Sequence, residues 1–294
     1  MMKLKVLELF GGIGACTKAL TRLGIDYELA DYVEINKYAA KSFNAIHGTN
    51  YETQDIREWD KALDVDLIMH GSPCQDFSVA GLNKGGDQDS GTRSSLMYET
   101  VRIVDKLRPK FVVWENVKNL LSKKHRHNFD AYLEAMSNLG YTNYYEVLNA
   151  KNFGIPQNRE RIFTVSIHKS VGIEFDFPQG RTLTAKLRDF LEKEVDPKYY
   201  ITDFTALTEI NKNYSMIEGG RIGKMHDMSR RAYNTNYISP TVHTSGGGNQ
   251  EPKIVIYDDY NSQVKADQSA INTLTTNRGK TAKRNGVKII EVGD

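Results

Sequence analysis

The sequence predicts an α/β fold with a doubly wound, mostly parallel sheet, followed by a smaller, irregular C-terminal domain. Two observations support the sheet. Up to about residue 170, short apolar runs alternate with amphipathic stretches, which is typical of βα units. Glycines such as Gly24 and Gly140 follow the amphipathic stretches, where helices end. The second domain is predicted because this alternation stops after about Pro178.

Each predicted element has its own signal. The strands are short apolar runs, expected at residues 5–10, 27–33, 63–69, 111–114, 144–148 and 161–167, with a further one ending near Asp55. The helices are amphipathic stretches, expected at residues 15–23, 37–43, 96–107, 129–139 and 183–191. Residues 1–178 would form one domain, to which ligands bind at the carboxyl ends of the strands. Residues 179–294 would form the other.

Composition narrows the class of protein. The chain has 294 residues, of which 39% are hydrophobic, and its apolar runs are too short to cross a membrane. Its first ten residues do not resemble a secretory signal, so we expect a cytoplasmic protein. Two cysteines outside any Cys-x-x-Cys pair favour neither a disulfide framework nor a zinc site, and no metal is expected.

Residues 179–294 contain two features of interest. The net charge of the whole chain is only +2, but residues 221–231 form a local basic patch. This patch would either contact nucleic acid or be a solvated loop. In addition, residues 238–255 are weakly echoed by residues 271–290, since both begin with an Ile/Thr-containing run and end in Lys followed by two β-branched residues. Chance similarity is the alternative to a repeat.

The candidate cofactor residues follow the first strands. Residues 10–14 place three glycines between a strand and a helix, where a ligand can approach the backbone. Glu34 follows the next strand and could accept hydrogen bonds from ribose hydroxyls. Asp55 could accept one from an exocyclic amine, and Phe10 could stack on the ligand. Singly, each feature could be a structural turn or a solvated loop end.

The candidate reactive residues follow later strands. Cys74 lies on a Gly/Pro-defined turn after residues 67–69, although most free cysteines are buried hydrophobes. The polar residues 80–95 would be a mobile lid or a surface loop without a catalytic role. Glu115 follows the strand at 111–113. Arg159 and Arg161 precede the next strand and could hold a carbonyl oxygen, a phosphate or Glu115 itself.

In order and spacing, these motifs resemble the DNA (cytosine-5)-methyltransferase family over roughly residues 4–168. The glycine turn resembles its cofactor loop, Pro73-Cys74-Gln75 its nucleophile motif, Glu115-Asn116-Val117 its acid motif and the arginine pair its base-holding motif. The resemblance implies the S-adenosylmethionine-dependent methyltransferase fold. The implied cofactor residues are Phe10, Gly11, Gly12, Ile13, Gly14, Glu34, Ile35, Asp55, Ile56 and Pro73. The implied contacts to duplex DNA are Gln75, Ser78, Lys84, Arg93, Arg221, Lys224, Arg230, Arg231 and Thr241, with residues 181–248 as the target-recognition region.

The resemblance also implies the chemistry. A methyl group would pass from S-adenosylmethionine to carbon 5 of a cytosine flipped out of a specific duplex sequence. Cys74 would add to carbon 6 of the ring. Glu115 would hold ring nitrogen 3 and the exocyclic amine, while Arg161, supported by Arg159, would hold the carbonyl at carbon 2.

The chain departs from the family's pattern near its end. The Gly-Asn-Ser-type segment that completes the family's cofactor pocket is not found before Asp294. We therefore expect a second polypeptide that supplies it, a compact form with weaker cofactor binding, or a substitute role for residues 271–290. A cognate restriction endonuclease is a further expected candidate partner.

Three other functions stay open. A tRNA cytosine-5 methyltransferase would share the large domain, but the basic patch and the sizeable recognition region favour DNA. A non-catalytic DNA-binding subunit or regulator would keep the fold, but all four candidate catalytic side chains are present. A nicotinamide dehydrogenase would explain the glycine turn and Glu34 but not Pro73-Cys74-Gln75.

Overall fold

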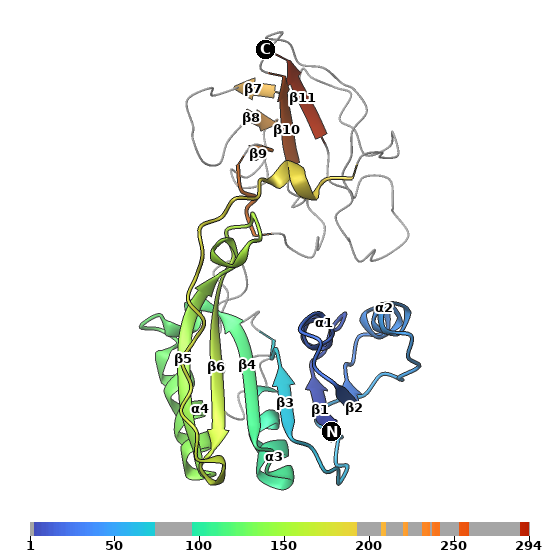
Figure 1. Cartoon of the computed structure of the whole chain (residues 1–294), viewed down its shortest axis with the longest axis vertical. Helices are drawn as coiled ribbons and strands as arrows, with labels where there is room; N and C mark the ends of the chain where they lie inside the picture. The colour runs from blue at the N-terminus through green and yellow to red at the C-terminus, as the bar shows by residue number, and fades with distance from the viewer. Residues whose placement is uncertain are drawn as a thin grey trace. The chain divides into compact units, whose positions relative to one another are not determined.

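The chain folds as two units, each with its own β-sheet (Figure 1). The structure is a computed structural model, and it describes residues 3–73, 96–192, 207–209, 220–222, 231–235, 237–241, 253–258 and 289–293. The first unit comprises Met1–Leu148 and Glu160–Pro178. The second comprises Asn149–Arg159 and Gln179–Asp294.

The first sheet has six strands in the order β2-β1-β3-β4-β6-β5. Its strands are β1 (Leu4–Leu9), β2 (Tyr27–Val33), β3 (Leu67–His70), β4 (Phe111–Val117), β5 (Tyr141–Asn149) and β6 (Glu160–His168). The β1 strand pairs in parallel with β2 and β3, and β3 pairs in parallel with β4, whereas β6 runs antiparallel to β4. The predicted α/β class with a mostly parallel sheet is confirmed.

The described residues of this unit form four α-helices: α1 (Ala15–Arg22), α2 (Lys37–His47), α3 (Met97–Leu107) and α4 (Arg126–Asn138). Local chemistry sets their ends. Asn36 caps α2, because its side chain accepts hydrogen bonds from the N–H groups of Tyr38 and Ala39. The residue that follows the helix, Gly48, caps its C-terminus with a φ of 66°, which favours glycine.

The main core of the unit contains a buried polar cluster beneath the end of β3. His70 is fully enclosed, and its ring stacks on Trp114 with centroids 5.6 Å apart. Its Nε2 atom lies 3.1 Å from the hydroxyl of Tyr132, and Nδ1 lies 3.4 Å from that of Thr100. Burial lowers the pKa of His70 to about 3, so the imidazole is neutral at physiological pH. The end of β3, where the chain leaves the sheet, is therefore supported by buried side chains that carry no charge.

The topology brings the candidate motifs of this unit to one edge. Because β1 to β4 are parallel, their carboxyl ends meet there, as the arrowheads of β1, β3 and β4 show (Figure 1). The antiparallel β6 starts at the same edge, where Arg161 pairs with Val117 of β4. Residues after β1, β2 and β3 therefore lie near the end of β4 and the start of β6.

Several sequence-based boundaries were wrong, three of them in segments that lead to or carry candidate site residues. The β4 strand continues to Val117, so Glu115 lies inside the strand, paired with Phe163, rather than after it. The β3 strand starts only at Leu67. No strand ends near Asp55, because hydrogen bonds from Glu58 N to Asp55 O (3.1 Å) and from Trp59 N to Ile56 O (3.3 Å) form a turn there.

The predicted helix at residues 183–191 was also wrong. Only the 3₁₀ turn η5 (Leu187–Phe190) forms within it. The N–H groups of Leu187 and Arg188 donate instead to the backbone carbonyls of Tyr237 and Thr235, each at 2.9 Å. Pairing within the second unit has therefore overridden the helical pattern.

In its described residues, the second unit has a five-stranded sheet in the order β11-β10-β9-β8-β7. Its strands are β7 (Leu207–Glu209), β8 (Gly220–Ile222), β9 (Arg231–Asn234), β10 (Lys253–Asp258) and β11 (Ile289–Gly293). The β10 and β11 strands pair in parallel, with Ile254 opposite Ile289. The ends of the two echoed sequence segments are thus neighbouring strands in matching register. Among the described residues, no helix is long and apolar enough to cross a membrane.

Candidate active site

The glycine turn after β1 is tightly held. Phe10 has a φ of 53°, uncommon for a residue with a side chain, and Gly12 and Gly14 also have positive φ. Gly14 N donates to Gly11 O at 2.8 Å, and the Tyr32 hydroxyl donates to Gly12 O at 2.6 Å. A Cβ atom on Gly12 would meet nothing within 4 Å. Hydrogen bonds to the carbonyls of Gly11 and Gly12 therefore fix the turn, and the space where a Gly12 side chain would lie is free of other atoms of the described residues.

A buried acid that the sequence analysis missed supports this turn. Glu8 is 1% exposed, and its Oε2 atom accepts hydrogen bonds from the backbone N–H of Thr17, at 3.2 Å, and from the Thr17 hydroxyl. It thereby caps the first turn of α1 from the neighbouring strand. Burial raises its pKa, although the Thr17 hydrogen bonds oppose the shift. The signal for this role was an acid between two buried leucines, Leu7 and Leu9.

Glu34 lies directly beside the glycine turn. Its Oε2 accepts a hydrogen bond from Gly12 N at 3.0 Å, and its Oε1 accepts one from Asn36 N at 2.7 Å. Gln54 N donates to the backbone carbonyl of Glu34 at 3.0 Å, which brings the Asp55 segment alongside. A carboxylate has about four acceptor positions, so Glu34 can accept further donors. The structure thus brings together the three segments predicted to form the cofactor site.

Asp55 opens the turn that follows. Its carboxylate accepts hydrogen bonds from the backbone N–H of Arg57 at 3.0 Å and from Arg57 Nε at 3.0 and 3.1 Å, and it also pairs with Arg57 Nη2. These contacts to Arg57 lower the pKa of Asp55. The next residue, Ile56, is 4% exposed with its side chain in the core, so it can reach a ligand only through its backbone.

Asp31 holds the other end of this segment from the core side. Its carboxylate accepts hydrogen bonds from Trp59 Nε1 at 2.8 Å, Lys61 Nζ at 2.7 Å and Gln54 Nε2 at 3.0 Å. Burial alone would raise the pKa of Asp31, but these donors outweigh it and the pKa is lowered. Residues 54–61 are therefore fixed at both ends.

Arg161 forms an ion pair with the candidate acid Glu115, which was one of the three partners considered for it from the sequence. Glu115 Oε1 lies 2.9 Å from Arg161 Nε, and the side chains are 32% and 18% exposed. The two residues are diagonal neighbours across β4 and β6, because Arg161 is paired with Val117. A Cβ atom on Gly71 would lie 3.7 Å from Glu115 Oε2. The carboxylate thus lies between Arg161 and the turn that leads to Cys74.

That turn is anchored on β4 through Ser72, which is 4% exposed. Trp114 Nε1 donates to Ser72 Oγ at 3.0 Å. Asn116 Nδ2 donates to Ser72 Oγ at 3.3 Å and to its backbone carbonyl at 3.4 Å. The two β4 residues that flank Glu115 therefore hold the chain two residues before Cys74.

Several predicted site residues lie outside the described part of the chain. They are Cys74, Gln75, Ser78, Lys84, Arg93, Lys224 and Arg230, together with the expected lid at 80–95. For Arg221 and Arg231 only the backbone is described, and it pairs them opposite each other in β8 and β9. Among the residues with described side chains, no group of three or more His, Cys, Asp or Glu could hold a metal ion.

Arg159 and Thr241 belong to the second unit. Arg159 lies just before β6, not within it, and its N–H donates to Asn149 Oδ1 at 3.1 Å. The Thr241 hydroxyl donates to the backbone carbonyl of Asn158 at 2.8 Å. Asn158 N donates in turn to Ser239 O at 2.9 Å. The loop that carries Arg159 is therefore tied to residues 239–241.

The cysteine with a described position, Cys16, differs in character from what a nucleophile needs. It lies in α1 and packs against the apolar cluster of Val6 and Leu20. Burial raises its pKa to about 12, with smaller contributions from the charges of Glu8 and Glu115. Cys16 is therefore a protonated thiol at physiological pH.

Gly14→Ala is expected to destabilise the protein by about 1–3 kcal/mol more than Gly24→Ala. Both glycines have left-handed backbones, with φ of 85° and 66°, which alone costs alanine about 1–2 kcal/mol. A Cβ atom on Gly14 would also lie 2.3 Å from His47 Nε2 and 2.6 Å from Phe43, whereas one on Gly24 meets nothing within 4 Å. Urea unfolding of both variants measures the difference. Equal losses would contradict the packing of Gly14.

The chain is similar to known methyltransferases. The sequence model described as C-5 cytosine-specific DNA methylase matches residues 4–287. "Orphan methyltransferase M.SPRI" of Bacillus phage SPR is 32% identical, over 97% of this chain and 73% of its own length. "Type II methyltransferase M2.ScrFI" of Lactococcus lactis subsp. cremoris is 35% identical, over 67% of this chain and 70% of its own.

A solved structure supports the fold. The putative DNA modification methyltransferase encoded within a prophage of E. coli superposes with a TM-score of 0.57, at 19% identity, over 82% of both chains. The sequence model and the relatives at 32% and 35% identity confirm the family predicted from the order of the motifs. This chain belongs to the C-5 cytosine-specific DNA methylase family, the DNA (cytosine-5)-methyltransferases.

Proposed function

We propose that this enzyme transfers a methyl group to carbon 5 of a flipped-out cytosine in a specific sequence of duplex DNA, through a covalent bond to Cys74. The observation that carries the proposal is the Glu115–Arg161 ion pair, packed against the turn that ends at Pro73. An acid and a cation at that place can hold a pyrimidine ring beside a nucleophile that follows one residue later.

The residues near Glu34 fit S-adenosylmethionine, the cofactor that the family uses. Glu34 supplies acceptors for ribose hydroxyls, and Asp55 supplies one for an exocyclic amine. A Cβ atom on Gly12 would meet nothing within 4 Å, so a ligand can approach the backbone there. We propose that these residues hold the cofactor, with Phe10, Gly11, Ile13, Gly14, Ile35, the Ile56 backbone and Pro73. When bound, the cofactor supplies an electrophilic methyl group on a sulfonium sulfur.

The residues of the chain make carbon 5 reactive. In the proposal, the Cys74 thiolate forms a bond to carbon 6, and the electrons of the 5,6 double bond shift through the ring toward nitrogen 3. Glu115, which takes up a proton before this step, donates it to nitrogen 3, and Arg161 holds the carbonyl at carbon 2. Arg159 is assigned to the support of that contact.

The adduct then collapses. After carbon 5 has gained the methyl group, a base takes the proton from the same carbon. The electrons of that C–H bond restore the double bond, the sulfur–carbon 6 bond breaks, and Cys74 leaves as a thiolate. Glu115 recovers its proton from nitrogen 3. All bonds made to the enzyme are thereby broken, and the product is 5-methylcytosine.

Duplex DNA is proposed as the substrate, and the cytosine must leave the helix because carbon 6 is out of reach inside it. The basic residues Lys84, Arg93, Arg221, Lys224, Arg230 and Arg231 are proposed to contact the DNA, with Gln75, Ser78 and Thr241. A second polypeptide that supplies the C-terminal segment and a cognate restriction endonuclease stay predictions.

The test is methyl transfer from labelled S-adenosylmethionine to duplex DNA and, in parallel, to tRNA. We expect label in DNA alone, recovered after nuclease digestion as 5-methyl-2′-deoxycytidine by mass spectrometry. Bisulfite sequencing of the product should place the methyl groups in one sequence context. Label only in tRNA, or on an exocyclic nitrogen of a base, would refute the proposed substrate or the proposed chemistry.

A further inference from the structure

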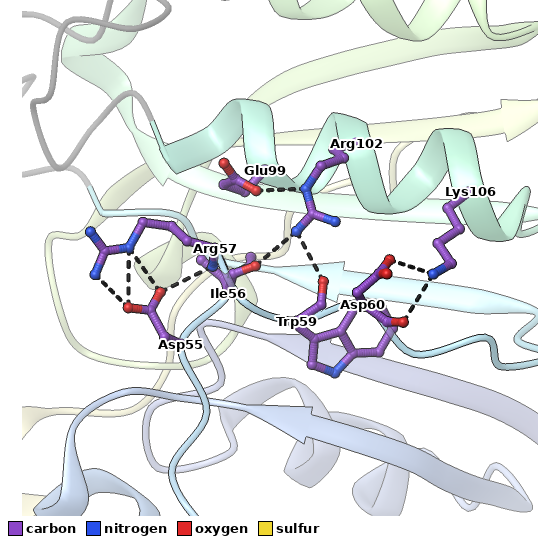
Figure 2. Close-up of polar contacts among 8 residues, drawn as sticks. All are labelled: Asp55, Ile56, Arg57, Trp59, Asp60, Glu99, Arg102 and Lys106. Carbon is purple, nitrogen blue, oxygen red and sulfur yellow. Dashed lines mark hydrogen bonds and ion pairs between the residues drawn. The ribbon is translucent and has the colours of Figure 1, made fainter.

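The turn that carries Asp55 and Ile56 is held from outside by helix α3 (Figure 2). Arg102 Nη2 donates to the backbone carbonyl of Ile56 at 2.9 Å and to that of Trp59 at 3.0 Å. Its Nε donates to Glu99 at 2.8 Å, one turn earlier in the same helix. Arg102 therefore joins both sides of the turn to helix α3, and its three partners do not include the Asp55 carboxylate.

The chemistry of this contact needs an arginine. A guanidinium has five N–H donors in one plane, so it can bind two carbonyls and a carboxylate together. Glu99 fixes the direction of the plane, and the side chain of Arg102 is 40% exposed. A lysine has one nitrogen on a flexible stem, and its ammonium cannot reproduce the three contacts in this geometry.

We propose that Arg102 is a positioning residue for cofactor binding, acting through the turn at Asp55 and Ile56. This inference rests on the proposed role of Asp55. The backbone of the turn sets where the Asp55 carboxylate and the Ile56 N–H face, and Arg57 fixes the carboxylate on that backbone. Arg102 holds the backbone in one shape before the ligand arrives, so less conformational freedom is lost on binding.

Lys106 offers a matched control. It lies one turn after Arg102 in α3 and contacts the far end of the same segment, donating to the Asp60 backbone carbonyl at 2.9 Å and pairing with the Asp60 carboxylate. That carboxylate is 76% exposed, and Asp60 was not assigned to the cofactor site. Lys106→Met thus removes a cation from the same helix without touching the Ile56 carbonyl (Figure 2).

The test is titration of the purified full chain with S-adenosylmethionine by calorimetry, which gives both affinity and stoichiometry. We expect Arg102→Met to weaken binding about five- to twentyfold, with one site per chain retained. Lys106→Met should stay within about twofold. In a methylation assay, Arg102→Met should raise KM for the cofactor by a similar factor and leave kcat at saturation nearly unchanged.

Three further variants guard against loss of folding. Glu99→Gln keeps Arg102 but removes its orienting charge, and it should weaken binding about two- to fivefold. Asp55→Asn should weaken binding by itself, and the double variant Asp55→Asn/Arg102→Met should lose less than the product of the two effects. Such non-additivity is expected only if Arg102 acts through the turn.

The failures are distinct. An unchanged affinity in Arg102→Met beside weakened binding in Asp55→Asn would overturn the inference and leave the proposed function intact. Unchanged affinity in Asp55→Asn would refute the proposed role of Asp55, and the inference would fall with it. If Arg102→Met lowers the number of binding sites per chain and the melting temperature but leaves the affinity for S-adenosylmethionine unchanged, Arg102 only stabilises the fold. That result also overturns the inference.

Discussion

Cys74→Ala is expected to lower methyl transfer by more than about 10⁴-fold, the order of loss seen when a covalent enzyme loses its nucleophile. Without the sulfur, carbon 5 of cytosine stays part of an electron-poor aromatic ring. Affinity for S-adenosylmethionine should stay within about twofold, because Glu34 and Asp55 make the contacts proposed for it. Calorimetry measures the affinity, and label transfer to duplex DNA measures the rate.

Duplex DNA that contains 5-fluorocytosine provides a direct readout of the same step. Fluorine replaces the proton that must leave carbon 5, so the bond between sulfur and carbon 6 should persist. The unchanged protein should form an adduct that survives denaturation, and Cys74→Ala should form none. Cys16→Ala is the matched control, because desolvation raises the pKa of the half-buried Cys16 thiol to about 12 and it should not react. An adduct that survives in Cys74→Ala but not in Cys16→Ala would reverse the assignment.

The sequence predicted which segments lie together at this site, but it did not predict the contacts between their side chains. Parallel strands end at one edge, so the order of the motifs was enough to place the glycine turn, Glu34, Glu115 and Arg161 together. The partner of Arg161 could not be chosen among three, because it depends on the register between β4 and β6. A diagonal contact across an antiparallel pair leaves no periodic signal in either strand.

Other contacts escaped the sequence because they join residues far apart in the chain. Arg102 and Ile56 are 46 positions apart, and Trp114 reaches Ser72 across 42. In each case a side chain donates a hydrogen bond to a polar group of a distant loop, and the sequence around that loop does not indicate the donor. The error at residues 183–191 has the same origin, since donors within an apparent helix bond to residues 235 and 237.

Glu115→Gln is expected to lower kcat by about 10²–10⁴-fold, the usual worth of a positioned acid. Glutamine keeps a donor near ring nitrogen 3 but cannot deliver a proton. Arg161→Met should lower kcat by about 10- to 10³-fold, since it removes the proposed contact to the carbonyl at carbon 2 and leaves Glu115 without the cation 2.9 Å away. Single-turnover assays with duplex DNA measure both losses without interference from product release.

The two residues should act as one unit. Because each orients the other, the double variant Glu115→Gln/Arg161→Met should be little slower than the worse single variant, rather than slower by the product of the two effects. The neighbouring ion pair between Lys118 and Glu160 is the matched control: it joins β6 to the residue after β4 with side chains 55% and 45% exposed. Exposed pairs of this kind contribute about 0–1 kcal/mol, so Lys118→Met should keep kcat within about threefold. Independent effects at Glu115 and Arg161 would mean that their ion pair serves the fold, and that the pyrimidine is held by other groups.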